Sequence, residues 1–181
     1  MLRSSRRAVL LVDGYNIIGI WPSLKQTRDR EGLEASREEL IEALVNYGAY
    51  EGLDTRIVFD SQYRDARCDR QIVTQNLSVY YTDFNQTADS FIERTCAVLK
   101  REVHTRSQRL IVATSDRALQ LTAVGYGAEW MSAHQLSRAV EATTSKRRRK
   151  YQPRKQPSSR FLISGLDAES QRRLSQLRMG L

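Results

Sequence analysis

The sequence predicts an α/β fold in which helices cover both faces of a parallel sheet. Short apolar runs of strand length alternate along the chain with segments of helical periodicity, a pattern typical of parallel sheets. The first run, AVLLVD at residues 8–13, is continuously apolar up to its last residue, as in a strand buried on both faces. Three of the runs also lead into an aspartate, which places acids at the ends of strands.

Each element follows from local pattern. Strands are predicted where short apolar runs are bounded by polar turns: residues 8–13, 55–60, 77–82, 109–114 and 128–131. Helices are predicted where apolar residues recur at helical spacing: residues 34–50, 88–103, 116–124 and 132–145. Ser132 and Gln135 form a capping-box pattern at the start of the last helix. Gly14 and Asn16 end the first strand, and the polar, basic residues 61–75 are expected to form a mobile loop.

The positive charge is concentrated in one segment. The net charge is +8, yet eight of the 29 basic residues lie in 146–160, and the remaining 21 equal the acidic residues in number. Such a block favours an arm that binds a polyanion, and the alternative is a solubility tail. Because the segment lacks apolar periodicity, we interpret it as a basic linker between a domain at 1–145 and a C-terminal segment at 161–181. A short amphipathic helix is expected at 167–178.

Several classes of protein are excluded by composition. Cys68 and Cys96 lack zinc or C-x-x-C spacing, so we expect reduced thiols and a cytoplasmic protein. No stretch approaches the roughly 18 apolar residues of a membrane span, so no membrane partner is expected. No dinucleotide fingerprint or Walker loop follows the first strand, so no nucleotide cofactor is expected. His104 and His134 have polar neighbours and are expected at the surface.

Four acids form the candidate site. Asp13, Asp60 and Asp116 follow strands, and Asp89 opens a helix. Ligands of parallel sheets bind at the carboxyl ends of strands, so these carboxylates are expected to converge there. Clustered carboxylates raise each other's pKa, and a divalent cation such as Mg²⁺ is the usual compensation. Together with the basic segment, this pattern favours chemistry on phosphodiesters.

Each acid also has a plainer interpretation. Asp89 and Asp116 are favoured at helix starts by the helix dipole, and Asp60 can begin a solvent loop. Asn16, which can order a water or a phosphate, can equally make an ordinary turn. A phosphatase with a D-x-D nucleophile is disfavoured because Tyr15 occupies the second acidic position.

The segment LLVDGYNIIGIWPSLK resembles the NYN domains, a branch of the PIN-like nucleases, and particularly the YacP-like group. The similarity continues through helix 34–50, IVFD, TADSFIE and VATSD, and into the basic arm. The resemblance implies a Rossmann-like PIN/NYN fold with strand order 3-2-1-4-5. It also implies Mg²⁺- or Mn²⁺-dependent endoribonuclease activity on single-stranded RNA and, for the YacP-like group, cleavage of mRNA on the ribosome.

The resemblance also implies roles for individual residues. Asp13, Asp89 and Asp116 are the expected catalytic acids, with Asn16 as their polar partner. Expected metal ligands are Asp13, Asp89, Asp116, Glu93 and Asp60; Glu93 lies one turn after Asp89, and Ser90 stands where relatives often have an acid. The expected RNA-binding residues are Lys146, Arg147, Arg148, Arg149, Lys150, Arg154 and Lys155. The alternative function is a non-catalytic RNA- or ribosome-binding module.

Overall fold

Residues 8–60, 69–83, 86–103 and 109–151 are described by the computed structural model of this chain. The elements in this part are β1 (Val9–Asp13), α1 (Gly14–Ile20), α2 (Pro22–Glu31), α3 (Leu33–Glu51), β2 (Asp54–Phe59), β3 (Asp69–Thr74), β4 (Leu77–Tyr81), α4 (Ala88–Val103), β5 (Leu110–Ala113), α5 (Arg117–Gly125), β6 (Glu129–Met131) and α6 (Ala133–Tyr151). The chain divides into two compact units, Met1–Lys146 and Arg147–Leu181, and the sheet belongs to the first.

The sheet has the order β3-β4-β2-β1-β5-β6. All neighbouring strands are parallel except β3, which runs antiparallel to β4 at the edge. The five expected strands therefore occur in the expected order 3-2-1-4-5, and the α/β fold class is confirmed. The predicted mobile loop over 61–75 is wrong for 69–74, which form β3. An edge strand faces solvent and tolerates charged side chains, so the apolar pattern of a core strand is absent there.

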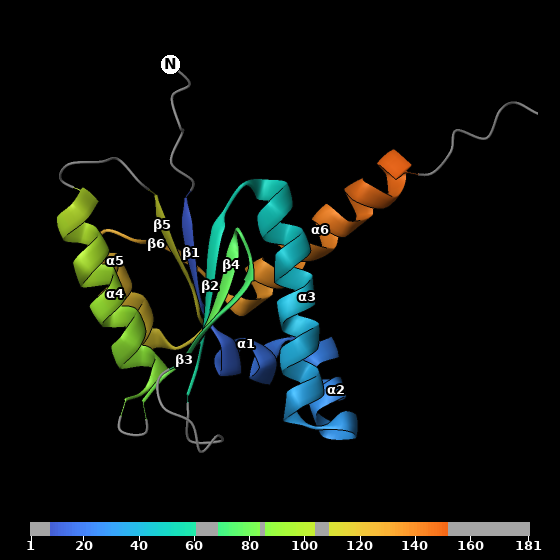
Figure 1. Cartoon of the computed structure of the whole chain (residues 1–181), viewed down its shortest axis with the longest axis horizontal. Helices are drawn as coiled ribbons and strands as arrows, with labels where there is room; N and C mark the ends of the chain where they lie inside the picture. Colours follow the sequence, from blue (N-terminus) through green and yellow to red (C-terminus); the bar gives the residue numbers. More distant parts are fainter. Residues whose placement is uncertain (1–7, 61–68, 84–85, 104–108, 152–181) are drawn as a thin grey trace, which may run out of the picture. The chain divides into compact units, whose positions relative to one another are not determined.

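Helices lie on both faces of the central strands. On one face, Leu10 and Val12 of β1 pack in a core that includes residues of α1, α3 and α6. On the other face, Val9 and Leu11 pack in a second core with residues of α4 and α5. Figure 1 shows α4 and α5 on one side of the sheet and α1–α3 on the other. Burial of alternate residues on both faces explains why the whole of β1 reads as apolar.

The two helices directly after β1, α1 and α2, were not expected from the sequence. Asp13 caps α1, because its Oδ1 accepts a hydrogen bond from the Asn16 backbone N–H at 3.4 Å. Pro22 occupies the first turn of α2, where its missing N–H is harmless. Only Leu24 of α2 is buried, so the segment lacks the apolar periodicity that identifies longer helices.

Gly14 directly follows the first strand, and its role there is one of packing. The glycines with positive φ among the described residues are Gly32, Gly52 and Gly127, so Gly14 is not required by backbone conformation. A Cβ at Gly14 would instead lie 2.2 Å from a ring carbon of Phe59. Gly14 therefore allows α1 to approach the buried end of β2.

The final described helix, α6, begins as predicted and extends further than expected. The backbone N–H of Gln135 donates to Ser132 Oγ at 3.2 Å, and Ser132 N–H donates to Gln135 Oε1 at 2.8 Å, which confirms the capping box. The helix continues to Tyr151, so residues 146–151 of the predicted linker are helical. Lysine and arginine have good helix propensity, and Pro153 is the first strong helix breaker in the segment. The helix predicted at 167–178 lies outside the described residues.

The structure describes one of the two cysteines and one of the two histidines. Cys96 is a buried free thiol, whereas Cys68 lies outside the described residues. His134 is exposed as expected, and His104 is not described. In the described part of the chain, none of the helices has the length and apolar character needed to cross a membrane.

The contact between Gly14 and Phe59 predicts a specific loss of stability. Gly14→Ala should lower the free energy of unfolding by about 1–3 kcal/mol, because the new methyl group overpacks the Phe59 ring. Gly19→Ala is the matched control in the same helix, since its Cβ would meet nothing within 4 Å. That control should be neutral or stabilising by up to about 1 kcal/mol in urea unfolding. Equal stability of the two variants would contradict this role of Gly14.

Candidate functional site

The carboxyl edge of the sheet brings the predicted acids towards one another. Asp13 ends β1 at the centre of the sheet, Asp60 follows the neighbouring β2, and Asp116 follows β5 on the other side. Asp89 lies in the first turn of α4, whose start is tied to the same edge by Asp60. The topology therefore places one acid centrally and the others around it, as the strand-end pattern predicts.

Asp13 is a buried acid with two hydrogen-bond donors. It is 6% exposed, its Oδ2 accepts from Thr114 Oγ1 at 3.0 Å, and its Oδ1 accepts from Asn16 N–H. Burial raises the pKa of Asp13 to about 6, against the lowering effect of the Thr114 hydrogen bond. The negative charges of Asp89 and Asp60 raise this pKa further. Ionised Asp13 is thus incompletely compensated by the protein itself.

Asp89 is the acid that links the others electrostatically. Burial raises its pKa first, and the negative charges of Asp116, Asp60 and Glu93 raise it further. Asp89 also raises the pKa of Asp13, so all five predicted metal ligands lie within electrostatic reach of at least one other. Repulsion of this kind favours a cation at the edge.

Asp60 and Asp116 each stabilise a helix start. Asp60 Oδ1 accepts from the backbone N–H of Ala88 at 2.8 Å, and Asp116 Oδ1 accepts from that of Leu119 at 2.9 Å. The helix-initiation interpretation of Asp116 is therefore correct for that oxygen. Asp60 holds the first turn of α4 across 28 residues of sequence rather than merely starting a loop. These capping bonds leave the second oxygen of each carboxylate for other interactions.

A polar network between the ends of β1 and β5 holds the site in place. Thr114 Oγ1 donates to Asp13 and accepts from the backbone N–H of Asp116 at 3.0 Å. Asn16 Oδ1 accepts from the backbone N–H of Ser115 at 2.8 Å, which ties α1 to the loop after β5. Sequence reasoning missed Thr114, although its position two residues before Asp116 in VATSD was a usable signal.

Arg37 is a second residue that the sequence did not reveal. It is 5% exposed, and its guanidinium donates to Tyr15 Oη at 3.2 Å and pairs with Glu34. It also lies 5.9 Å from the centre of the Tyr81 ring. The sequence signal that could have identified Arg37 was its place on the inward face of the predicted helix 34–50. Through Tyr15, Arg37 supports the α1 segment that follows Asp13.

The donors at this edge suit a hard divalent cation. Within 8–60, 69–83, 86–103 and 109–151, no three His, Cys, Asp or Glu side chains are placed to hold one metal ion together. Mg²⁺ is usually bound by one or two carboxylates, with waters and substrate phosphates completing its shell. Two electrostatically coupled carboxylates, Asp13 and Asp89, fit that requirement without a third protein ligand.

The basic residues predicted to bind RNA are described only in part. Lys146, Arg147 and Arg148 are exposed on α6. Arg149 and Lys150 continue the same helix, and Arg154 and Lys155 lie outside the described residues. The helical backbone therefore presents Lys146, Arg147 and Arg148 around the helix axis instead of along an extended linker.

The raised pKa of Asp13 predicts a pH-dependent effect of Asp13→Asn. The folded-state pKa of about 6 exceeds the ordinary 3.8, so ionised Asp13 destabilises the fold. This cost is absent below about pH 4 and complete above about pH 7. In EDTA, the free energy of unfolding of Asp13→Asn should therefore increase relative to that of wild type by up to about 3 kcal/mol as the pH rises from about 4 to about 7. Urea unfolding of both proteins across this pH range measures the difference in unfolding free energy. Glu38→Gln, on the exposed surface of α3, is the control. A difference between Asp13→Asn and wild type that does not change with pH would contradict the prediction.

Comparison with known proteins gives a consistent family assignment. The YacP-like NYN domain model matches residues 10–179. The chain is 35% identical over 133 residues to the protein YacP of Bacillus subtilis strain 168, covering 74% of this chain and 75% of that protein. A crystal structure of a mutant of Rae1 (YacP) from Bacillus subtilis has 31% identity and a TM-score of 0.65, covering 93% of this chain and 99% of that one.

A second crystal structure of Rae1 (YacP) from Bacillus subtilis has 29% identity and a TM-score of 0.62, covering 95% of this chain and 90% of that one. These matches confirm the predicted resemblance, and the acids at the carboxyl edge occupy the part of the chain that carries it. NYN domains form part of the PIN-like nuclease superfamily, whose members act on RNA and generally use divalent metals. The chain belongs to the YacP-like NYN domain family.

Proposed function

We propose that this protein is a metal-dependent endoribonuclease that cleaves single-stranded RNA, with mRNA on the ribosome as its substrate. The observation that carries the proposal is the coupling of buried Asp13 to Asp89 at the carboxyl edge of a YacP-like NYN domain. In a binding module Asp13 would serve only to cap α1 and to bond Thr114, and neither role requires a second acid nearby. A site that binds a divalent cation would use the negative charge of both acids.

The carboxylates would have different roles in such a site. Asp13 and Asp89 would hold a Mg²⁺ or Mn²⁺ ion, which supplies activation of a water and stabilisation of the leaving oxygen. Thr114 and the Asn16 backbone fix the Asp13 carboxylate, so little reorganisation is needed when the ion binds. Asp116 would orient the attacking water or a second ion with the oxygen that does not cap α5.

Three further residues would assist at the same edge. Glu93, which lies one turn after Asp89 on α4, and Asp60 would add further negative charge around the cation. Asn16 would then act chiefly by holding the loop at Ser115 in register with Asp13. Because its carbonyl oxygen is engaged there, contact of Asn16 with a water or a phosphate would come from its Nδ2 amide group.

The basic run supports RNA as the partner. Residues 146–160 account for the whole excess of positive charge in the chain. Neutralising RNA phosphates releases counterions, so such a run supplies affinity without base specificity. Lys146 to Lys150 lie on α6, and a helix presenting cations to phosphates suits the RNA-rich surface of a ribosome as well as mRNA.

The alternative is an RNA- or ribosome-binding module without catalysis. It is favoured by the capping bonds of Asp60 and Asp116, which give both acids a structural reason to be present. Asp13 caps the short α1, and no capping bond of the Asp89 side chain is seen in the described part of the chain. Asp89, and the repulsion between it and Asp13, therefore discriminate between the functions.

Substitution of the central acids tests catalysis and metal binding together. Asp13→Asn and Asp89→Asn should each reduce cleavage of a defined mRNA at least about a hundredfold, with and without ribosomes, because each removes a metal ligand. Mg²⁺ or Mn²⁺ should raise the melting temperature of wild type more than that of either variant, since only intact sites bind the ion tightly.

Glu38→Gln is the control and should behave as wild type in both measurements. Each Asn variant should retain its fold in EDTA, because removing a charge relieves repulsion. Full cleavage by Asp13→Asn or Asp89→Asn would refute the ligand assignment, and absence of cleavage by folded wild type would favour the binding module.

The basic run is tested by the salt dependence of RNA binding. Replacing Arg147, Arg148, Arg149 and Lys150 with Gln should lower the slope of log affinity against log salt by about 3, at roughly 0.7 for each lost phosphate contact. Lys25→Gln with Arg30→Gln, on exposed α2 surface, is the control and should change the slope little. An unchanged slope in the quadruple variant would identify the run as a solubility tail.

A further inference from the structure

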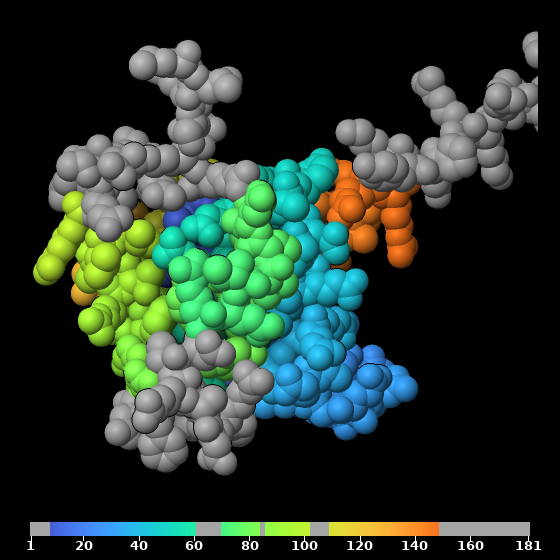
Figure 2. Space-filling model, viewed as in Figure 1, coloured from blue at the N-terminus to red at the C-terminus, as the bar shows by residue number. Residues whose placement is uncertain are grey.

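A groove lies beside α4 on the face of the sheet that this helix only partly covers. The helix packs against β1 and β2, and β4 and β3 continue the sheet beyond it. In Figure 2 the β3–β4 hairpin forms a surface next to α4. The groove has a volume of about 490 Å³, which is in the range of small-ligand sites. We call it the α4 groove; its lining includes Arg56, Asp83, Gln86, Phe91, Arg94 and Leu99.

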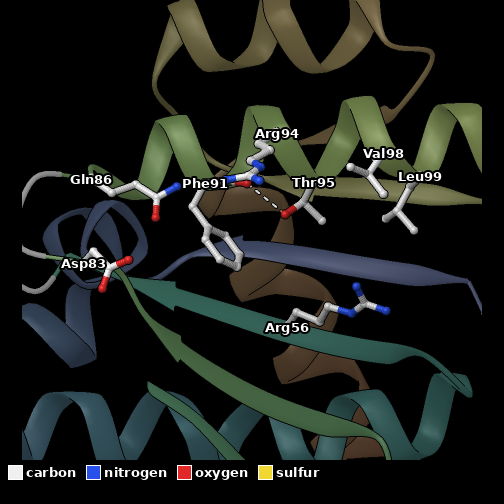
Figure 3. Close-up of a pocket in the computed structure, with 8 residues that line it drawn as sticks. All are labelled: Arg56, Asp83, Gln86, Phe91, Arg94, Thr95, Val98 and Leu99. Atoms are coloured by element: carbon white, nitrogen blue, oxygen red, sulfur yellow. Dashed lines mark hydrogen bonds between the residues drawn. The ribbon is translucent and has the colours of Figure 1, made fainter. Parts of the chain in front are cut away.

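One end of the α4 groove lies at the carboxyl edge of the sheet. Asp83 and Gln86 come from the segment between β4 and α4, and Phe91 lies in the first turns of α4. Asp60 follows the neighbouring strand β2 and accepts from the backbone N–H of Ala88 at the start of α4, so this end of the groove and the acids share the carboxyl edge of the sheet. Figure 3 shows Asp83 and Gln86 at one end and Arg56 and Leu99 at the other.

The lining combines cations with apolar and aromatic surface. Arg56 is held by Asp54, with Nη2 and Oδ2 at 2.9 Å. Arg94 is exposed on α4, and no ion pair of this side chain is seen within the described residues. Phe91 provides an aromatic surface, and its ring lies 5.2 Å from that of Tyr80 on β4. Aromatic rings and guanidinium groups side by side are the usual means of holding single-stranded nucleic acid.

The groove also carries hydrogen-bonding groups at the end nearer the acids. The carboxylate of Asp83 accepts hydrogen bonds, and the amide of Gln86 both donates and accepts. Such groups match the edge of a nucleobase, whereas a free phosphate would be repelled by Asp83. The arginines suit the backbone phosphate of the same or the next nucleotide.

We propose that the α4 groove binds one nucleotide of single-stranded RNA next to the acid site. The base packs on Phe91, with Asp83 and Gln86 at its edge, and Arg94 and Arg56 contact backbone phosphates. This proposal rests on the proposed function for its substrate, RNA. It adds the path that the RNA strand takes away from the acids. The groove then leads the RNA chain to the carboxyl edge of the sheet, where the acids lie.

Binding of a fluorescent RNA hexanucleotide to the full chain tests the groove separately from cleavage. All measurements use an Asp13→Asn background with Mg²⁺ present, so that no RNA is cut. Arg94→Glu should weaken binding about tenfold, because attraction to a phosphate becomes repulsion. Arg101→Glu is the matched control, since Arg101 is an exposed arginine of the same helix outside the groove lining, and it should change binding less than threefold.

A second measurement tests stacking on Phe91. Hexanucleotides with a single abasic position should show one position at which loss of the base weakens binding to the parent protein. In Phe91→Leu, which keeps an apolar side chain, that position should no longer differ from the others. Equal effects of Arg94→Glu and Arg101→Glu, or an abasic profile unaltered by Phe91→Leu, would overturn the proposal and leave the groove as a docking site for a protein segment.

The outcomes separate this proposal from the nuclease function. If folded wild type cuts no RNA while the groove variants alter binding as stated, the nuclease proposal fails and the nucleotide site stands. If wild type cuts RNA and the groove variants bind as their control does, the nuclease proposal stands and the groove assignment fails.

Discussion

The hydrogen bond from Thr114 to Asp13 is the interaction on which the candidate site depends. It spans 101 residues of sequence and joins the ends of the neighbouring strands β1 and β5. The same hydroxyl accepts from the backbone N–H of Asp116, so one side chain sets the positions of two acids. Asn16 adds a second link by accepting from Ser115. The carboxyl edge is therefore a rigid polar network, and a buried acid can be held there without collapse of the surrounding structure.

The energetic cost of this arrangement is visible in the acids themselves. Burial and repulsion raise the pKa of both Asp13 and Asp89, and each hydrogen bond to Asp13 offsets only part of that cost. Asp13, Asp60 and Asp116 each accept from a helix N-terminus. Asp13 and Asp89 are the acids whose negative charge is opposed by burial and by neighbouring acids, and a cation would balance that charge. This unbalanced charge gives a physical basis for treating Asp13 and Asp89 as the centre of the proposed nuclease site.

The α4 helix connects the edge to the rest of the molecule. Its start is held by Asp60, its first turn carries Asp89, and its later turns form one wall of the α4 groove. Opposite this wall lie Arg56 of β2 and the residues Asp83 and Gln86 between β4 and α4. A single helix therefore carries Asp89 and Glu93 as well as one wall of the groove, and its first turn is tied to the carboxyl edge of the sheet.

The sequence by itself determined the alternation of strands and helices and the presence of acids at the carboxyl ends of strands, whereas the order of the five parallel strands was implied by the resemblance to the NYN domains. These features are local, since burial on both faces imposes a continuous apolar run, and parallel connections place strand ends on one edge. Tertiary structure alone decided that Gly14 makes room for Phe59, that Asp60 caps α4 and that Thr114 holds Asp13. It also decided that 69–74 form an edge strand and that Arg37 is buried. Each depends on a contact with a distant segment or on an exposed edge, neither of which leaves a periodic signal in the local sequence.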